Sequence, residues 1–193
     1  MKPIARLFAV WILSIGTTNA HSLAPVWPSL SEGVLHPLLG LDHCLALIGL
    51  GLWSQQSHLR FPARIFIPIM LMAMSGGGVL GHLAPQWPWV DHLIAASVFV
   101  IGALLTGLLP SHRLLSFFAA CGFLLLHGYA HGMELPISSN GLSYGAGFLL
   151  TSAVLIGIGR GLGHLTQRKR GIEALIGIAL MSAGCFFWLI TLR

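Results

Sequence analysis

A short stretch in the middle of the chain carries two histidines and an acid at helical spacing. His127, His131 and Glu134 stand at positions i, i+4 and i+7, so in a helix they lie within about 60° of one face. Gly128 and Gly132 leave open space on the adjacent strip. Two imidazoles and a carboxylate suit borderline divalent ions such as nickel, cobalt, zinc or copper. This face therefore predicts a metal site or a proton pathway.

A second group of the same residue types comes earlier in the chain. A proline is tolerated in the first turn of a helix, so Pro37 predicts a helix that starts there, with His36 at its outer mouth. Asp42 and His43 then lie one to two turns further in. In a continuous helix His36 and His43 share a face and Asp42 points elsewhere. An irregular first turn would bring all three together, and the spacing alone leaves both arrangements open.

Four other residues are weaker candidates for metal ligands or for groups that support a ligand. His82 and His92 fit a ligand, a residue that orients a ligand, or an interface residue. Asp91 fits a polar role, in the pathway or against a histidine. His21 would become the first residue of a processed chain, where its free amine and imidazole together form a metal-binding pair. The remaining single histidines are expected to be interfacial: His58, His112 and His164.

The elements that position these residues must be membrane helices. Of the 193 residues, 55% are hydrophobic and only 8% are charged, and the mean hydropathy is +0.85. A soluble domain carries about 25% charged residues, so composition excludes a soluble enzyme, a nucleic-acid-binding protein and a disordered chain. The three cysteines lie in apolar segments, which does not fit a disulfide framework.

The chain is predicted to be an all-α integral membrane protein with a cleavable leader. Residues 1–20 have a basic start, a short apolar run and small residues before position 21, which is typical of a signal peptide. Residues 21–193 then form a single domain of about six transmembrane helices, because a span needs ~20 apolar residues. The predicted spans are 34–53, 62–83, 91–109, 114–132, 142–163 and 172–192.

Charge predicts the orientation of these spans. Nearly all the basic residues fall on one side, which is therefore cytoplasmic, and the mature N-terminus is periplasmic. They are Arg60, Arg64, Arg113, Arg160, Arg168, Lys169 and Arg170, against Arg193 alone on the other side. The acids and histidines of the candidate sites gather near the outer side, whereas His58, His112 and His164 are expected at the cytoplasmic interface. Ionisable residues at membrane depth are costly and usually mark a pathway.

The two histidine-bearing stretches resemble the HupE/UreJ family, membrane proteins associated with hydrogenase and urease maturation. The family's H-x5-D-H motif is matched by His36, Asp42 and His43. Its F-H-G-x-A-H-G-x-E motif is matched from His127 to Glu134. Leu126 replaces the family's Phe, a departure that concerns packing more than ligation. The resemblance covers essentially the whole chain.

The resemblance implies a nickel, or cobalt, permease of the bacterial inner membrane rather than an enzyme. The ion would be cargo, with no bound cofactor, and the partners would be the bilayer, the divalent ion and hydrogenase or urease maturation proteins, with no nucleic acid. The predicted metal residues are His36, Asp42, His43, His127, His131 and Glu134.

Three alternatives remain open at this point. The first is a membrane accessory protein or metal sensor that binds metal without moving it. The second is a His-ligated membrane metalloenzyme, although the chain has no H-E-x-x-H motif and no nucleophile beside a base. The third is a haem protein that uses intramembrane histidines. Ligand types do not select one metal, because geometry and availability decide selectivity.

Overall fold

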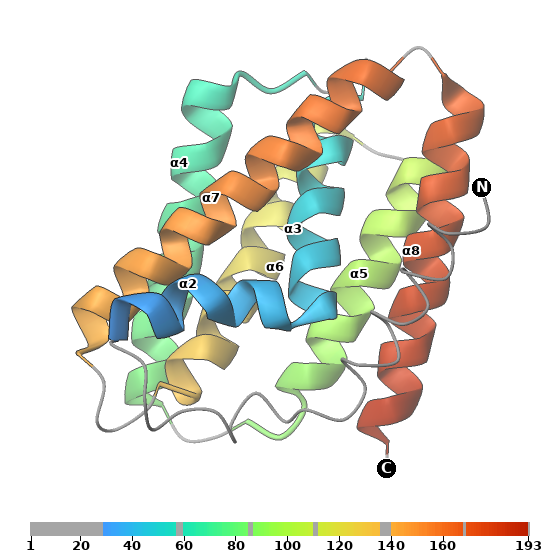
Figure 1. Cartoon of the computed structure of the whole chain (residues 1–193). Helices are drawn as coiled ribbons and strands as arrows, with labels where there is room; N and C mark the ends of the chain where they lie inside the picture. Colours follow the sequence, from blue (N-terminus) through green and yellow to red (C-terminus); the bar gives the residue numbers. More distant parts are fainter. Residues whose placement is uncertain are drawn as a thin grey trace, which may run out of the picture.

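The part of the chain described by a computed structural model is helical. The description covers residues 29–56, 60–84, 87–109, 112–135, 140–167 and 169–192, and it contains no strand. Figure 1 shows the helices as one bundle, with α2 lying across the others near one end. Their bounds are α2 Ser29–Leu39, α3 Leu41–Trp53, α4 Ala63–Leu83, α5 Val90–Thr106, α6 Arg113–Met133, α7 Gly141–Thr166 and α8 Arg170–Thr191.

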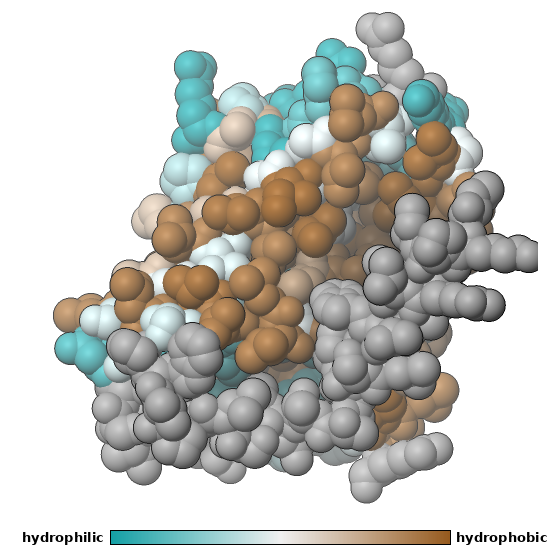
Figure 2. Space-filling view, viewed as in Figure 1, coloured by the Kyte–Doolittle hydropathy of each residue, from teal (hydrophilic) through white to brown (hydrophobic). Residues whose placement is uncertain are grey.

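Four of the predicted spans are confirmed as helices long and apolar enough to cross a bilayer, namely α4, α6, α7 and α8. Helix α5 is apolar but has only 17 residues. The number of six spans stays a prediction. The proposed leader, residues 1–20, and His21 lie outside the described residues. Figure 2 shows a broad apolar surface over the middle of the bundle, consistent with contact with lipid.

The first predicted span, 34–53, is two helices rather than one. Helices α2 and α3 meet at a bend of 77°, and Gly40 between them has an extended backbone. The predicted helix start at Pro37 is therefore wrong, since α2 begins at Ser29 and contains Pro37. A proline inside a helix removes one backbone hydrogen bond and weakens the turn before it. The helix is interrupted three residues later, at Gly40.

The helices pack in pairs through glycines. Helix α4 lies along α6, α5 lies along α8, and α7 lies along both α2 and α3. Small residues allow the close backbone approach that membrane helices use in place of a hydrophobic driving force. A Cβ added at Gly128 of α6 would overlap the carbonyl of Met74 in α4, and one at Gly132 would overlap the carbonyl of Gly78. These contacts fix α6, and with it the predicted metal face.

Two adjacent glycines of α4 give a direct test of this packing. A Cβ at Gly77 would overlap the Leu125 carbonyl of α6, whereas a Cβ at Gly76 meets nothing within 4 Å. Gly77→Ala is expected to lower the free energy of unfolding by about 1–3 kcal/mol, the usual cost of overpacking. Gly76→Ala should be neutral or stabilising by up to about 1 kcal/mol, through helix propensity. Thermal unfolding of the two purified variants measures the difference, and equal midpoints would contradict this account of the α4–α6 contact.

The two ends of the bundle differ in chemistry. Helices α4 and α6 end, and α5 and α7 begin, at the end that carries the histidine motifs, which we call the histidine end. The opposite end, where α4, α6 and α8 begin, carries Arg60, Arg64, Arg113, Lys169 and Arg170 and is called the arginine end. Helix α3 has 13 residues, about 20 Å at 1.5 Å per residue, which is less than a ~30 Å hydrocarbon core. Its first turn therefore places side chains inside the bundle rather than at the mouth.

Candidate metal site

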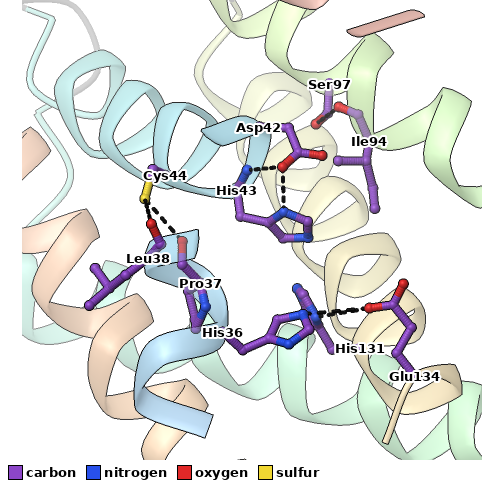
Figure 3. Close-up of polar contacts among 10 residues, drawn as sticks. All are labelled: His36, Pro37, Leu38, Asp42, His43, Cys44, Ile94, Ser97, His131 and Glu134. Carbon is purple, nitrogen blue, oxygen red and sulfur yellow. Dashed lines mark hydrogen bonds and ion pairs between the residues drawn. The ribbon is translucent and has the colours of Figure 1, made fainter. Parts of the chain in front are cut away.

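Three helices bring the predicted site residues together. His36 comes from α2, Asp42 and His43 from the first turn of α3, and His131 from the last turn of α6. Figure 3 shows these side chains turned toward one another across the bend between α2 and α3. The bend resolves the question that spacing left open. Because α2 turns away at Gly40, His36 and His43 meet as neighbours across the bend instead of as members of one helical face.

The outer group, which we call the outer triad, consists of His36, His131 and Glu134. The Glu134 Oε2 atom lies 3.5 Å from Nε2 of His36 and 3.9 Å from Nδ1 of His131. One potential ligand atom from each residue lies within 4.8 Å of the others. Two imidazoles and one carboxylate at this separation match the donor set of a divalent transition-metal ion.

The imidazoles continue inward from the outer triad as a line of rings. The centroids of His36 and His131 are 4.5 Å apart, those of His131 and His43 are 4.4 Å apart, and those of His43 and His127 are 5.3 Å apart. His131 is 3% exposed and His127 is 1% exposed. The line therefore leads from the partly exposed His36 and Glu134 to a fully enclosed histidine.

Hydrogen bonds leave one nitrogen of each inner ring free to bind an ion. Nδ1 of His127 lies 2.9 Å from the Phe123 carbonyl, and a carbonyl only accepts, so this nitrogen carries the proton. Nδ1 of His43 lies 2.6 Å from Oδ1 of Asp42 in the same way. Buried nitrogens without a hydrogen-bond partner in the described part of the chain are Nε2 of His43, Nε2 of His127 and both ring nitrogens of His131. A buried polar atom without a partner is costly, so a cation that accepts these lone pairs fits the site.

The carboxylate of Asp42 contacts both the backbone and the ring of His43. The same carboxylate oxygen accepts from the His43 backbone N–H at 2.9 Å and contacts the ring Nδ1. Asp42 stands in the first turn of α3, where backbone N–H groups lack helical partners and favour an acid. A carboxylate on the far nitrogen of a metal-binding histidine fixes its tautomer and orientation.

The weaker candidates lie outside the line of rings. His82 is exposed in the last turn of α4. The ring of His92 packs against Trp89 and Trp188, with centroids 5.4 and 5.1 Å away. Asp91 is exposed and within electrostatic reach of Asp42 and Glu134.

A cavity of about 820 Å³ lies between α4, α6 and α7, beside the outer triad. Its lining is mostly apolar, with Met74, Val79, Leu83, Phe148 and Leu149 among its members. The polar side chains that reach it are Ser75, His82, His131, Asn140 and Tyr144. The cavity therefore joins the line of imidazoles to the histidine end of the bundle.

Sequence reasoning missed Tyr144, which lies in the first turns of α7 with its ring centroid 5.9 Å from that of His36. Its only signal in the sequence was a phenol near the start of a largely apolar span. Cys44, one residue after His43, donates its thiol to the Pro37 carbonyl at 3.0 Å. That carbonyl is near the end of α2, where the break removes helical donors, so Cys44 stabilises the bend.

Among the described residues, the line of imidazoles ends at His127. Further along the buried face of α6 stand Leu124 and Ala120, opposite Met70 and Met74 of α4. The arginine end is then closed by an aromatic cluster of Trp53, Phe61, Phe66 and Phe117, in which Phe61 and Phe66 are stacked at 5.6 Å. Among the described residues, the site is therefore reached from the histidine end.

Arg160 of α7 holds the aromatic cluster together at the arginine end. Its guanidinium donates to Ser54 Oγ at 2.8 Å and to the Phe61 carbonyl at 2.7 Å, and it lies over the Phe66 ring. These contacts tie α7 to the end of α3 and to the start of α4.

The comparisons with known proteins agree on one family. A family model described as HupE / UreJ protein matches residues 9–187. "Protein HupE" of Rhizobium leguminosarum bv. viciae is 36% identical over 157 residues, which cover 79% of this chain and 80% of the relative. No solved structure matches the chain significantly. The chain belongs to the HupE/UreJ family, and its long apolar helices make it a multi-pass membrane protein of that family.

Proposed function

We propose that the chain is a permease that carries nickel, or cobalt, across the bacterial inner membrane. The observation that supports this most directly is the line of four imidazoles, three of which have buried nitrogens without a hydrogen-bond partner among the described residues. Packing alone gives no reason to bury so many free lone pairs in an apolar bundle. Family membership is consistent with this role.

The proposed route begins at the outer triad. An ion bound by His36, His131 and Glu134 has the ring of His43 beside that of His131, and His127 beyond it. Closely spaced sites allow the ion to exchange one ligand at a time, which keeps each site weak enough to release it. In this proposal His36, His43, His127, His131 and Glu134 bind the ion and Asp42 positions His43.

The proposed direction is import. The basic residues of the arginine end would face the cytoplasm by the positive-inside rule, which leaves the histidine end and the mature N-terminus periplasmic. The described conformation is open to the histidine end and closed by the aromatic cluster, so release requires the arginine end to open. The imported metal would supply hydrogenase or urease maturation.

Flux into sealed vesicles tests the proposal. Liposomes that contain the purified chain and a trapped nickel-sensitive dye should report uptake of external Ni²⁺ faster than protein-free liposomes. Cobalt added outside should compete if both ions share the route. Dye quenching that is the same with and without protein would contradict the permease.

A membrane accessory protein that binds metal without flux is the second candidate. The end of the line of imidazoles at His127 favours it, because the next buried residues of α6 toward the arginine end, Leu124 and Ala120, are apolar. Stoichiometric Ni²⁺ binding by the purified chain together with absent flux would select this candidate. A bis-histidine haem site does not fit, because axial ligands lie on opposite faces of a macrocycle and these rings are in contact with one another.

A further inference from the structure

We propose that Tyr144 is a positioning residue whose hydroxyl holds a water ligand on the ion bound at the outer triad. The inference rests on the proposed function, because it assumes a divalent metal ion at this triad. It implies that the ion bound at the outer triad is partly hydrated, with water ligands facing the cavity and protein ligands on the opposite side.

The hydroxyl of Tyr144 is not needed for the packing of α7 against its neighbouring helices. The residue is 4% exposed, and its hydroxyl is buried without a hydrogen-bond partner among the described residues. A buried phenol normally finds a partner for its O–H. The ring itself is well packed, stacked on Phe148 with an interplanar angle of 6°. A phenylalanine would make the same ring contacts, so packing does not require the hydroxyl.

Tyr144 lies beside the outer triad. Its ring centroid is 5.9 Å from that of His36, in an edge-on arrangement. It lies within electrostatic reach of Glu134. It also shares the lining of the cavity with His131. One phenol, supplied by α7, thus contacts the ring of His36 and lines the same cavity as His131.

The coordination chemistry leaves room for water at this place. The outer triad offers three protein ligands, whereas a nickel or cobalt ion takes about four to six. The cavity of about 820 Å³ far exceeds the roughly 30 Å³ share of one water molecule. Most of its lining is apolar, so Tyr144 is one of the few side chains there that hydrogen-bonds a water ligand.

The test removes the hydroxyl and nothing else. In Tyr144→Phe, the Kd of the purified full-length chain for Ni²⁺ alone, measured by calorimetry, should rise about 10-fold, the effect of one hydrogen bond to a charged centre. The matched control is Tyr129→Phe in α6, the only other tyrosine of the chain. Its ring lies against Trp87 and is not part of the cavity lining. The control should bind Ni²⁺ as the unmodified chain does.

A spectrum of the bound metal separates positioning from a structural effect. The visible absorption of bound Co²⁺ reports the number and geometry of its ligands, and it should change in Tyr144→Phe but not in Tyr129→Phe. An unchanged Kd and spectrum in Tyr144→Phe would overturn the role of the hydroxyl and leave the permease proposal intact. An unmodified chain that binds neither ion would overturn this inference and the metal site on which the proposed function depends.

Discussion

Replacing His131 with alanine is expected to abolish nickel uptake by cells that express the chain. His131 is the ring that joins the outer triad to the inner histidines, since it contacts both His36 and His43. Loss of a residue that only orients a ligand already costs about 10–100-fold in metal affinity. Loss of a central ligand should therefore weaken Ni²⁺ binding by about 100-fold or more. Uptake of radioactive nickel at sub-micromolar concentration measures the effect.

A matched histidine is the control for this substitution. His164 stands in the last turns of α7, exposed at the arginine end, where its ring pairs with Gln167. His164→Ala should leave uptake unchanged at equal abundance in the membrane. Among the described residues the His131 ring makes no hydrogen bond, and its one ion-pair contact is with Glu134 at 3.9 Å, so few polar contacts of the fold are lost and His131→Ala should still insert. Normal uptake in an inserted His131→Ala protein would remove this ring from the route.

Asp42→Asn is expected to weaken Ni²⁺ binding by about 10–100-fold, as for other carboxylates that hold a metal-binding histidine. The asparagine side chain has the size of aspartate but lacks the charge that favours a proton on Nδ1 of His43. An amide that turns its NH₂ toward Nδ1 selects the other tautomer, with the proton on Nε2. That proton blocks the nitrogen that faces the other rings. Calorimetry with the purified variant measures the loss.

The proposed dependence of Asp42 on His43 can be isolated by a double-mutant cycle. If Asp42 acts only through His43, then Asp42→Asn should add little in a chain that already carries His43→Ala. Additive losses would instead make Asp42 a ligand in its own right, as the sequence motif alone suggested. The cycle needs only the Kd of four proteins for the same ion.

The metal face of α6 could be predicted from the sequence because helical periodicity is a local property. The i, i+4 spacing alone places His127 and His131 on one face, and both are buried there. Glu134 follows at the C-terminal cap of α6, and its carboxylate still reaches His131. The four longest spans follow from apolar runs of sufficient length, which is again a local property.

The helix break at Gly40 could not be predicted from the sequence in the same way. Pro37 is compatible with a helix start or with an interior position next to a break, and local rules favour the start. The tertiary contact of α2 with α7 decides otherwise. Gly33 fits so closely against the Tyr144 carbonyl that any Cβ would overlap it, and this contact holds α2 across the bundle. The length of helix before Pro37 depends on that contact.

Composition and periodicity are local properties, so they are enough to identify a helical membrane chain with metal-binding residue types grouped toward one end. Which of those residues meet depends on how the helices pack in three dimensions. The bend at Gly40 brings His36 and His43 to His131, close glycine contacts position α6, and α7 adds Tyr144. Contacts between segments a hundred residues apart depend on the packing of whole helices, which no local spacing encodes.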